Sequence, residues 1–242
     1  MTDKEWKVHR HGPLTPLAEN LWTVTGAVPH MSLERTMTVA RLQDGGLVLH
    51  SVIAMDDARM ADLEALGTPQ YMVVPNGWHR LDAARYKARY PQLKVICPRD
   101  ARAAVEKVVP VDTTYERANP IQHGDPTVRL IAFPAKQQVE GVMVVTSADG
   151  NTLAFGDTLF NLERMPGLCG LIYGKWMGAA GGPKISPIGV MMMRWVGDCS
   201  LVAAELRRIA VDEKPVRLVP GHGALVTEDP AAVLKRMAAQ IQ

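Results

Sequence analysis

Three segments of the chain carry polar side chains with useful chemistry shortly after apolar runs. His79 follows one such run, Asp157 follows a second, and His222 stands between two glycines after a third. Imidazoles and carboxylates are groups that ligate metal ions in proteins. Taken singly, each residue is weak evidence for a functional site, because an aspartate after a strand is most often part of a turn or a helix cap and Gly-His-Gly can be a tight turn. Their placement after three separate runs predicts a shared site at the ends of strands.

The first half of the chain contains the elements needed to position the first of these residues. Strand-like runs cover residues 21–28, 36–42 and 47–53, and Asp44-Gly45-Gly46 predicts a hairpin turn between the last two. Asp56 or Asp57 can cap a helix that Gly67 ends. The pattern then predicts a strand at 71–74, a helix at 81–90, a strand at 94–97 and a helix at 100–109.

The second half repeats this plan. Strands are predicted at 128–133, 142–146, 152–155 and 216–219. A helix with Val202, Leu206 and Ile209 on one face precedes the last of them, and Asp229-Pro230 begins a final helix. Strand pairs followed by helix, strand and helix, twice over, predict an α+β protein in which two sheets pack together with helices outside.

The composition is that of a globular chain, and it argues against binding to nucleic acid and against a membrane span. It has 242 residues, of which 47% are apolar, and 27 basic side chains face 25 acidic ones. A net charge of +2 without a basic stripe argues against nucleic acid, and apolar runs broken before about 18 residues argue against a membrane span. The charged N-terminal residues do not resemble a signal peptide, and three scattered cysteines predict no disulfide framework. We expect one domain over residues 1–242 in the cytoplasm.

The order of the motifs resembles the metallo-β-lactamase superfamily. The matching pieces are Pro-Asn-Gly-Trp-His at 75–79, Phe-Pro-Ala-Lys at 133–136, Phe-Gly-Asp-Thr-Leu-Phe at 155–160 and Val-Pro-Gly-His-Gly at 219–223. More narrowly, the stretch from Asp-Gly-Gly to His-Ser at 44–51 is similar to a branch known only as a domain of unknown function. The resemblance covers about residues 17–234 and implies an αββα sandwich, two mixed sheets flanked by helices. Its hydrolases hold one or two metal ions at the end of the sheets.

The chain departs from that superfamily at the metal ligands. Its hydrolases carry His-x-His-x-Asp-His in the first loop, where this chain reads Asn-Gly-Trp-His-Arg-Leu at 76–81. Only His79 can coordinate strongly there, and it is out of register. Lys136 stands in the place of the next histidine. The resemblance implies that Asp157 is the metal-bridging aspartate and His222 the last histidine. Two ligand positions are fewer than the three of a catalytic zinc site, so we expect no metal and no cofactor.

Lys136 is expected to replace the charge of the missing metal. An unpaired Asp157 in a partly buried loop is costly, and an ammonium neutralises it without activating water. The alternative is that Lys136 extends into solvent. His50 is expected to make a structural hydrogen bond, and His9 and His11 to lie in a solvated tail. The predicted pocket contains Asn76, Trp78, His79, Arg80, Lys136, Asp157 and His222.

Residues 165–194 form an apolar segment rich in glycine and methionine, with almost no charge. A long apolar loop inside a compact protein is usually functional or an interaction surface. We expect it to cover the mouth of the pocket or to form a homodimer contact. The alternative is an insertion that packs on its own core.

Two functions remain open from the sequence. In the first, the chain binds a small ligand without metal catalysis, an anion being favoured by His79, Arg80 and Lys136. In the second, it is a metal-dependent hydrolase with one metal held by His79, Asp157 and His222. The missing ligands favour the first function. Fold alone does not decide between the two.

Overall fold

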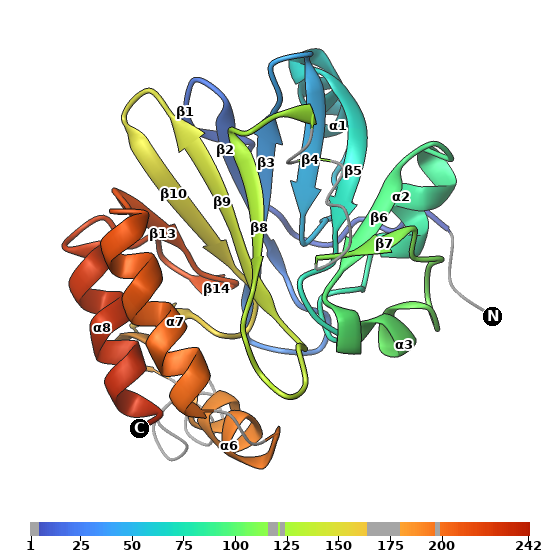
Figure 1. Ribbon diagram of the computed structural model, residues 1–242. Helices are drawn as coiled ribbons and strands as arrows, with labels where there is room; N and C mark the ends of the chain where they lie inside the picture. The colour runs from blue at the N-terminus through green and yellow to red at the C-terminus, as the bar shows by residue number, and fades with distance from the viewer. Residues whose placement is uncertain (1–4, 116–120, 122–123, 164–179, 197–198) are drawn as a thin grey trace.

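The computed structural model describes residues 5–115, 121, 124–163, 180–196 and 199–242 (Figure 1). Its elements are, in order, β1 (Thr15–Ala18), β2 (Leu21–Ala27), β3 (Glu34–Arg41), β4 (Gly46–His50), α1 (Asp57–Leu66), β5 (Thr68–Val73), α2 (Ala83–Arg89), β6 (Lys94–Cys97), η1 (Arg99–Ala101), α3 (Arg102–Val105), β7 (Thr113–Thr114), β8 (Val128–Ala132), β9 (Gly141–Ser147), β10 (Gly150–Phe155), β11 (Phe160–Leu162), β12 (Gly182–Lys184), α6 (Pro187–Val196), α7 (Cys199–Asp212), β13 (Arg217–Val219), β14 (His222–Gly223) and α8 (Pro230–Gln240).

Two large mixed sheets form the centre of the molecule, as predicted. The first has the order β1 to β7, antiparallel as far as β4 and parallel from there on. The second has the order β13-β10-β9-β8, in which only the β10–β13 pair is parallel. A small third sheet, β12-β11-β14, was not predicted. Its strands have two or three residues, which is too short for a periodic signal.

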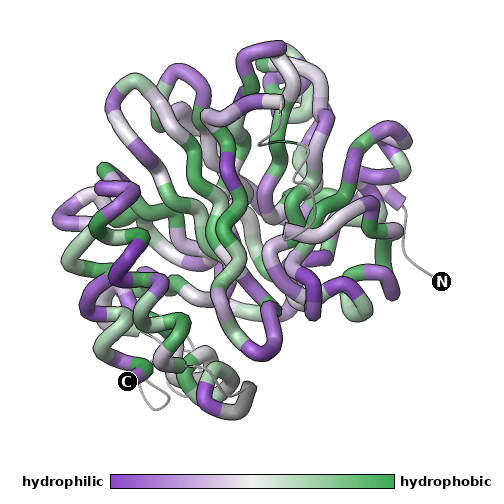
Figure 2. Tube along the Cα trace, in the orientation of Figure 1, coloured by the Kyte–Doolittle hydropathy of each residue, from purple (hydrophilic) through white to green (hydrophobic). Residues whose placement is uncertain are grey.

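The buried side chains form three apolar layers. One lies between the first sheet and helices α1 and α2, and a second between the second sheet and helices α7 and α8. The third lies between the two sheets. These layers arise because successive side chains of a strand point to opposite faces of its sheet. In β9, Val142 and Val144 belong to the layer beneath the helices, and Met143 and Val145 belong to the layer between the sheets. The αββα sandwich is therefore confirmed (Figure 1), and apolar residues follow the strands of both sheets (Figure 2).

Some predicted bounds are wrong for local reasons. The strand expected to reach residue 53 ends at His50, because Ser51 adopts a left-handed backbone conformation with φ 59°. The helix expected at 100–109 ends at Val105, and the chain continues in turns as far as Val109, whose backbone N–H donates to the carbonyl of Val105 at 3.0 Å; Pro110, which has no N–H, follows.

The apolar segment expected to be a loop contains regular structure where it is described. Strand β12 and helix α6 fall within residues 180–196, while residues 164–179 lie outside the described part. Met191 on α6 is 59% exposed. Among the described residues, no helix combines the length and apolar character needed to cross a bilayer.

Candidate metal centre

The segment after β5 forms a turn that points His79 inward and Trp78 outward. The side-chain oxygen of Asn76 accepts hydrogen bonds from the backbone N–H groups of Trp78, at 2.8 Å, and His79, at 3.1 Å. An asparagine that bonds its own following backbone in this way forms an Asx turn. His79 is consequently buried, whereas Trp78 is 79% exposed. The sequence prediction grouped both in a pocket, and the structure separates them.

Asp157 lies just beyond β10, where a buried carboxylate holds its backbone. Glu140 accepts hydrogen bonds from the backbone N–H of Asp157 through Oε2, at 3.0 Å, and from that of Thr158 through Oε1, at 2.8 Å. Strands β9 and β10 are antiparallel neighbours, so the residue before β9 lies beside the end of β10. Nothing in the sequence marks Glu140 as part of the site, because a single acidic residue before a strand is typical of any exposed strand end.

Two glycines allow His222 to approach the end of β10. A Cβ on Gly221 would lie 2.2 Å from the carbonyl oxygen of Gly156, and one on Gly223 would lie 2.0 Å from that of Asn161. Gly223 also has a φ of 99°, which side chains other than glycine rarely adopt. The glycines on both sides of His222 are therefore needed because other backbone segments pack closely against them, as well as for the turn that the sequence indicated.

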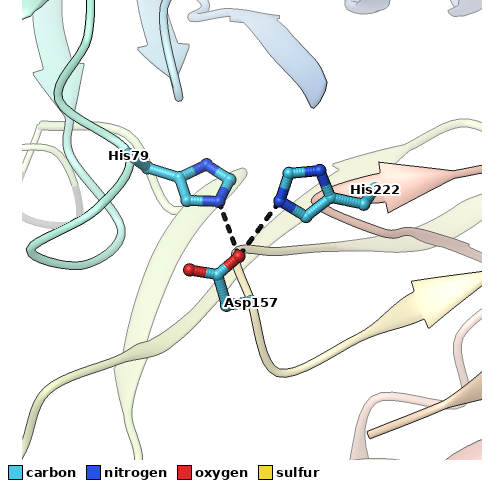
Figure 3. Close-up of side chains that lie close together, drawn as sticks. All are labelled: His79, Asp157 and His222. Carbon is cyan, nitrogen blue, oxygen red and sulfur yellow. Dashed lines mark hydrogen bonds and ion pairs between the residues drawn. The ribbon is translucent and has the colours of Figure 1, made fainter. Parts of the chain in front are cut away.

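These three segments bring two imidazoles and a carboxylate together (Figure 3). The Nε2 atoms of His79 and His222 each lie 3.0 Å from Oδ1 of Asp157. The three donor atoms lie within 4.8 Å of one another. In the described part of the chain, this is the group of histidine, cysteine and acidic side chains that comes close enough to hold a metal ion.

The second nitrogen of each imidazole is fixed by a neighbouring group. Ser51 Oγ lies 2.7 Å from Nδ1 of His79, and the backbone carbonyl of Glu34 accepts from Nδ1 of His222 at 2.6 Å. A carbonyl oxygen can only accept, so Nδ1 of His222 carries a hydrogen and Nε2 is the ring nitrogen that faces Asp157. A lone pair facing a carboxylate oxygen requires a cation between them, either a proton or a metal ion. Metal-binding histidines are oriented in this way.

The charges of the site favour a cation. Burial raises the pKa of Asp157, but the charge of His79 and the hydrogen bonds from both imidazoles hold it well below its usual range. Burial lowers the pKa of His79, and the negative charge and hydrogen bond of Asp157 outweigh this effect, so the net shift is upward. Burial, followed by the charge of Asp157, raises the pKa of Glu140. Asp157 therefore supplies a persistent negative charge between the two rings.

The two predicted cationic pocket residues have other positions. The Arg80 guanidinium donates to the backbone carbonyl of Ala104. Lys136 is exposed in the loop between β8 and β9. The structure pairs Asp157 with His79 and His222 instead, which corrects the predicted pairing with Lys136. The reason is that the Asx turn brings the His79 ring to the carboxylate, so no ammonium is needed there.

Two further histidines differ from their predictions. The side chain of His11 is only 6% exposed, and its Nε2 accepts from the backbone N–H of Asp56 at 3.0 Å. The prediction that His11 lies in a solvated tail is therefore wrong. His50 is buried, and within the described residues its Nε2 has no hydrogen-bond partner.

The chain resembles known proteins in its three-dimensional structure. No protein-family model and no curated protein matches the chain. The DIM-1 metallo-β-lactamase matches with a TM-score of 0.61 and 12% identity, over 96% of this chain and 100% of that chain. The FIM-1 enzyme from Pseudomonas aeruginosa in the mono-zinc form gives 0.61 and 10%, over 98% of each chain. A metallo-β-lactamase from Erythrobacter litoralis gives 0.62 and 12%, over 97% and 100%. This chain has the metallo-β-lactamase fold.

Within the metallo-β-lactamase fold, the structure changes the expected number of ligands. The sequence pattern counted Asp157 and His222 and set His79 aside as out of register. The structure places the His79 ring at the same carboxylate oxygen as His222, which makes three donors. Two imidazoles and one carboxylate are a known ligand set of catalytic zinc sites. The residues present therefore fit one divalent metal ion.

Proposed function

We propose that the chain is a hydrolase that uses one divalent metal ion held by His79, Asp157 and His222. The observation that carries the proposal is the fixed ring of His222, whose Nδ1–H donates to the Glu34 carbonyl and leaves Nε2 facing Asp157. A metal ion satisfies both the lone pair and the carboxylate. This choice departs from the metal-free function that the sequence favoured, because that preference depended on a count of two ligands.

The residues around the three donors have defined roles in this proposal. Ser51 orients His79, and the Glu34 carbonyl orients His222. Glu140 positions the backbone of Asp157. When bound, the metal would lower the pKa of a water molecule and polarise the substrate. FIM-1, a protein of the same fold, has been crystallised in a mono-zinc form, which is compatible with a one-metal centre.

The remaining parts of the function are proposed from the sequence. We expect a small-molecule substrate and a cytoplasmic protein. The net charge of +2 supports a partner other than nucleic acid. A homodimer contact through residues 165–194 stays a prediction.

Metal analysis tests the proposal directly. Protein purified without chelator should contain about one equivalent of zinc, manganese or iron. Zinc added to stripped protein at about 100 times its Kd should stabilise the fold by roughly 2.7 kcal/mol. The variants His79→Ala and His222→Ala should lose both effects, because two ligands remain in each.

The control variant is His9→Gln, which changes a histidine of the N-terminal arm and should behave like the parent protein. Absence of bound metal, together with a melting temperature that zinc leaves unchanged, would refute the metal centre. The metal-free ligand-binding function would then be the better conclusion.

A further inference from the structure

We propose that Asn76 limits this centre to one metal ion, because its side-chain amide occupies the place that a second cation would take. The inference rests on the proposed metal binding by His79, Asp157 and His222. It concerns the opposite side of the Asp157 carboxylate, where a second acidic side chain, Glu140, lies close by.

The two oxygens of Asp157 face different groups. Oδ1 lies 3.0 Å from the Nε2 atoms of both His79 and His222. Oδ2 accepts a hydrogen bond from Nδ2 of Asn76 at 2.9 Å. Figure 3 shows Oδ1 directed to the two rings, while the second oxygen points away from His222. Asp157 therefore offers one oxygen to a metal between the imidazoles and has the other already engaged.

The orientation of the Asn76 amide follows from its four partners. Its oxygen accepts from the backbone N–H groups of Trp78 and His79, and its nitrogen donates to Asp157 and Glu140. The reversed amide would point its NH2 group at two N–H donors and its oxygen at two carboxylates. All four hydrogen-bonding positions of the amide are used, and the side chain is buried.

The amide nitrogen bridges two carboxylates. It lies 2.9 Å from Oδ2 of Asp157 and 2.9 Å from Oε2 of Glu140. Glu140 also accepts the backbone N–H groups of Asp157 and Thr158, so its carboxylate is held facing the amide. Two carboxylate oxygens that face the same place are two of the oxygen ligands that a hard cation such as Mn²⁺ prefers. In this chain, the NH2 group of a neutral amide lies at that place and donates one hydrogen bond to each carboxylate.

The variant Asn76→Asp tests this with a minimal change. An aspartate keeps the oxygen that accepts from Trp78 and His79, and it replaces the amide nitrogen by a third carboxylate oxygen. The parent protein should bind one divalent equivalent in equilibrium dialysis against zinc plus manganese, and Asn76→Asp should bind two. Without metal, Asn76→Asp should melt at a lower temperature than the parent, and Mn²⁺ should raise its melting temperature more.

Two further variants complete the experiment. Asn20→Asp is the matched control, because it makes the same amide-to-carboxylate change at an asparagine between β1 and β2, whose amide donates to the carbonyl of Thr146 near the far end of β9. It should bind one equivalent. If Asn76→Asp does not fold, Asn76→Ser retains a turn acceptor without adding charge. It should also bind a second equivalent, more weakly than Asn76→Asp, because a hard cation such as Mn²⁺ can be held by the carboxylates of Asp157 and Glu140 while it keeps water molecules as its other ligands.

The outcomes separate the two proposals. One equivalent in the parent and in both Asn76 variants would overturn the role of Asn76 and leave the one-metal hydrolase intact. Two equivalents in the parent would also overturn the role of Asn76. No metal in the parent protein would overturn the proposed function, and this inference with it.

Discussion

Among the single residues, His50 is a buried imidazole at the end of β4 that stays neutral in the folded protein. It is 1% exposed, and its Nε2 has no hydrogen-bond partner within the described chain. Burial, helped by the charge of His79, lowers its pKa to about 3. In the unfolded chain its pKa is about 6.5. The structural hydrogen bond expected of this residue is therefore missing at Nε2.

This difference in pKa predicts that His50 makes the protein sensitive to acid. The unfolded state takes up the proton first, so stability is lost as the pH falls from about 6.5 toward 3. Between about pH 7 and about pH 4.5 the expected loss is roughly 2 to 3 kcal/mol. The free energy of unfolding of His50→Leu should fall less than that of the parent over the same pH range, and the difference should be about the loss given above. Urea unfolding of both proteins with a chelator measures this, and equal losses would contradict it.

At the scale of elements, Asp82 joins three parts of the first sheet and its helices in a buried ion network. It pairs with Arg35 of β3 and with Arg85 of α2. It also accepts the backbone N–H of Ala54, in the segment that follows β4, at 3.0 Å. The side chain of Asp82 is 1% exposed. One buried carboxylate therefore pairs with guanidinium groups from two different elements.

Removing this carboxylate should be strongly destabilising. Asp82→Ala removes a buried carboxylate that pairs with two buried guanidinium groups, and we expect a loss of about 3 to 5 kcal/mol. Asp62→Ala, which removes the exposed partner of Arg59, should cost less than about 1 kcal/mol. Denaturant unfolding of the two variants compares them. Similar small losses in both would show that the network does not hold these elements together.

The contact between β14 and the end of β10 leads to a prediction for a residue that is not a ligand. Gly221→Ala places a methyl group against the Gly156 carbonyl, so the backbone that carries His222 must move. We expect a destabilisation of roughly 1 to 3 kcal/mol and weaker metal binding. Calorimetric titration with zinc tests the second effect. Gly12→Ala, whose Cβ meets only an ordinary contact at 3.7 Å, is the control and should bind as the parent does.

At the scale of the whole molecule, the proposed centre lies where the two large sheets come together. The backbone N–H of Thr36 in β3 donates to the carbonyl of Gly221 at 2.9 Å, and the ring of His222 bonds the carbonyl of Glu34. His79 comes from the first sheet and Asp157 from the second. The centre therefore depends on the packing of both halves.

Residues 165–194 carry a prediction about assembly. Met191 on α6 is 59% exposed, and an apolar segment of this composition needs a cover. We expect it to be covered by a second subunit or by a bound apolar group, and to gain protection from hydrogen exchange when that cover is present. Light scattering with hydrogen exchange measures both. A strict monomer in which the segment is fully protected without ligand would mean that it is ordinary core.

The sequence by itself determined the αββα elements and the strand ends that carry Asp157 and His222. Apolar periodicity reports which face of a strand or helix is buried, as in β9, and this is a local property. Only the tertiary structure decided the number of ligands. The inward direction of His79 depends on an Asx turn and on Ser51, and Asp157 lies 78 positions away from His79 and 65 from His222. Such contacts have no spacing rule along the chain, because they are set by how two sheets pack rather than by neighbouring residues.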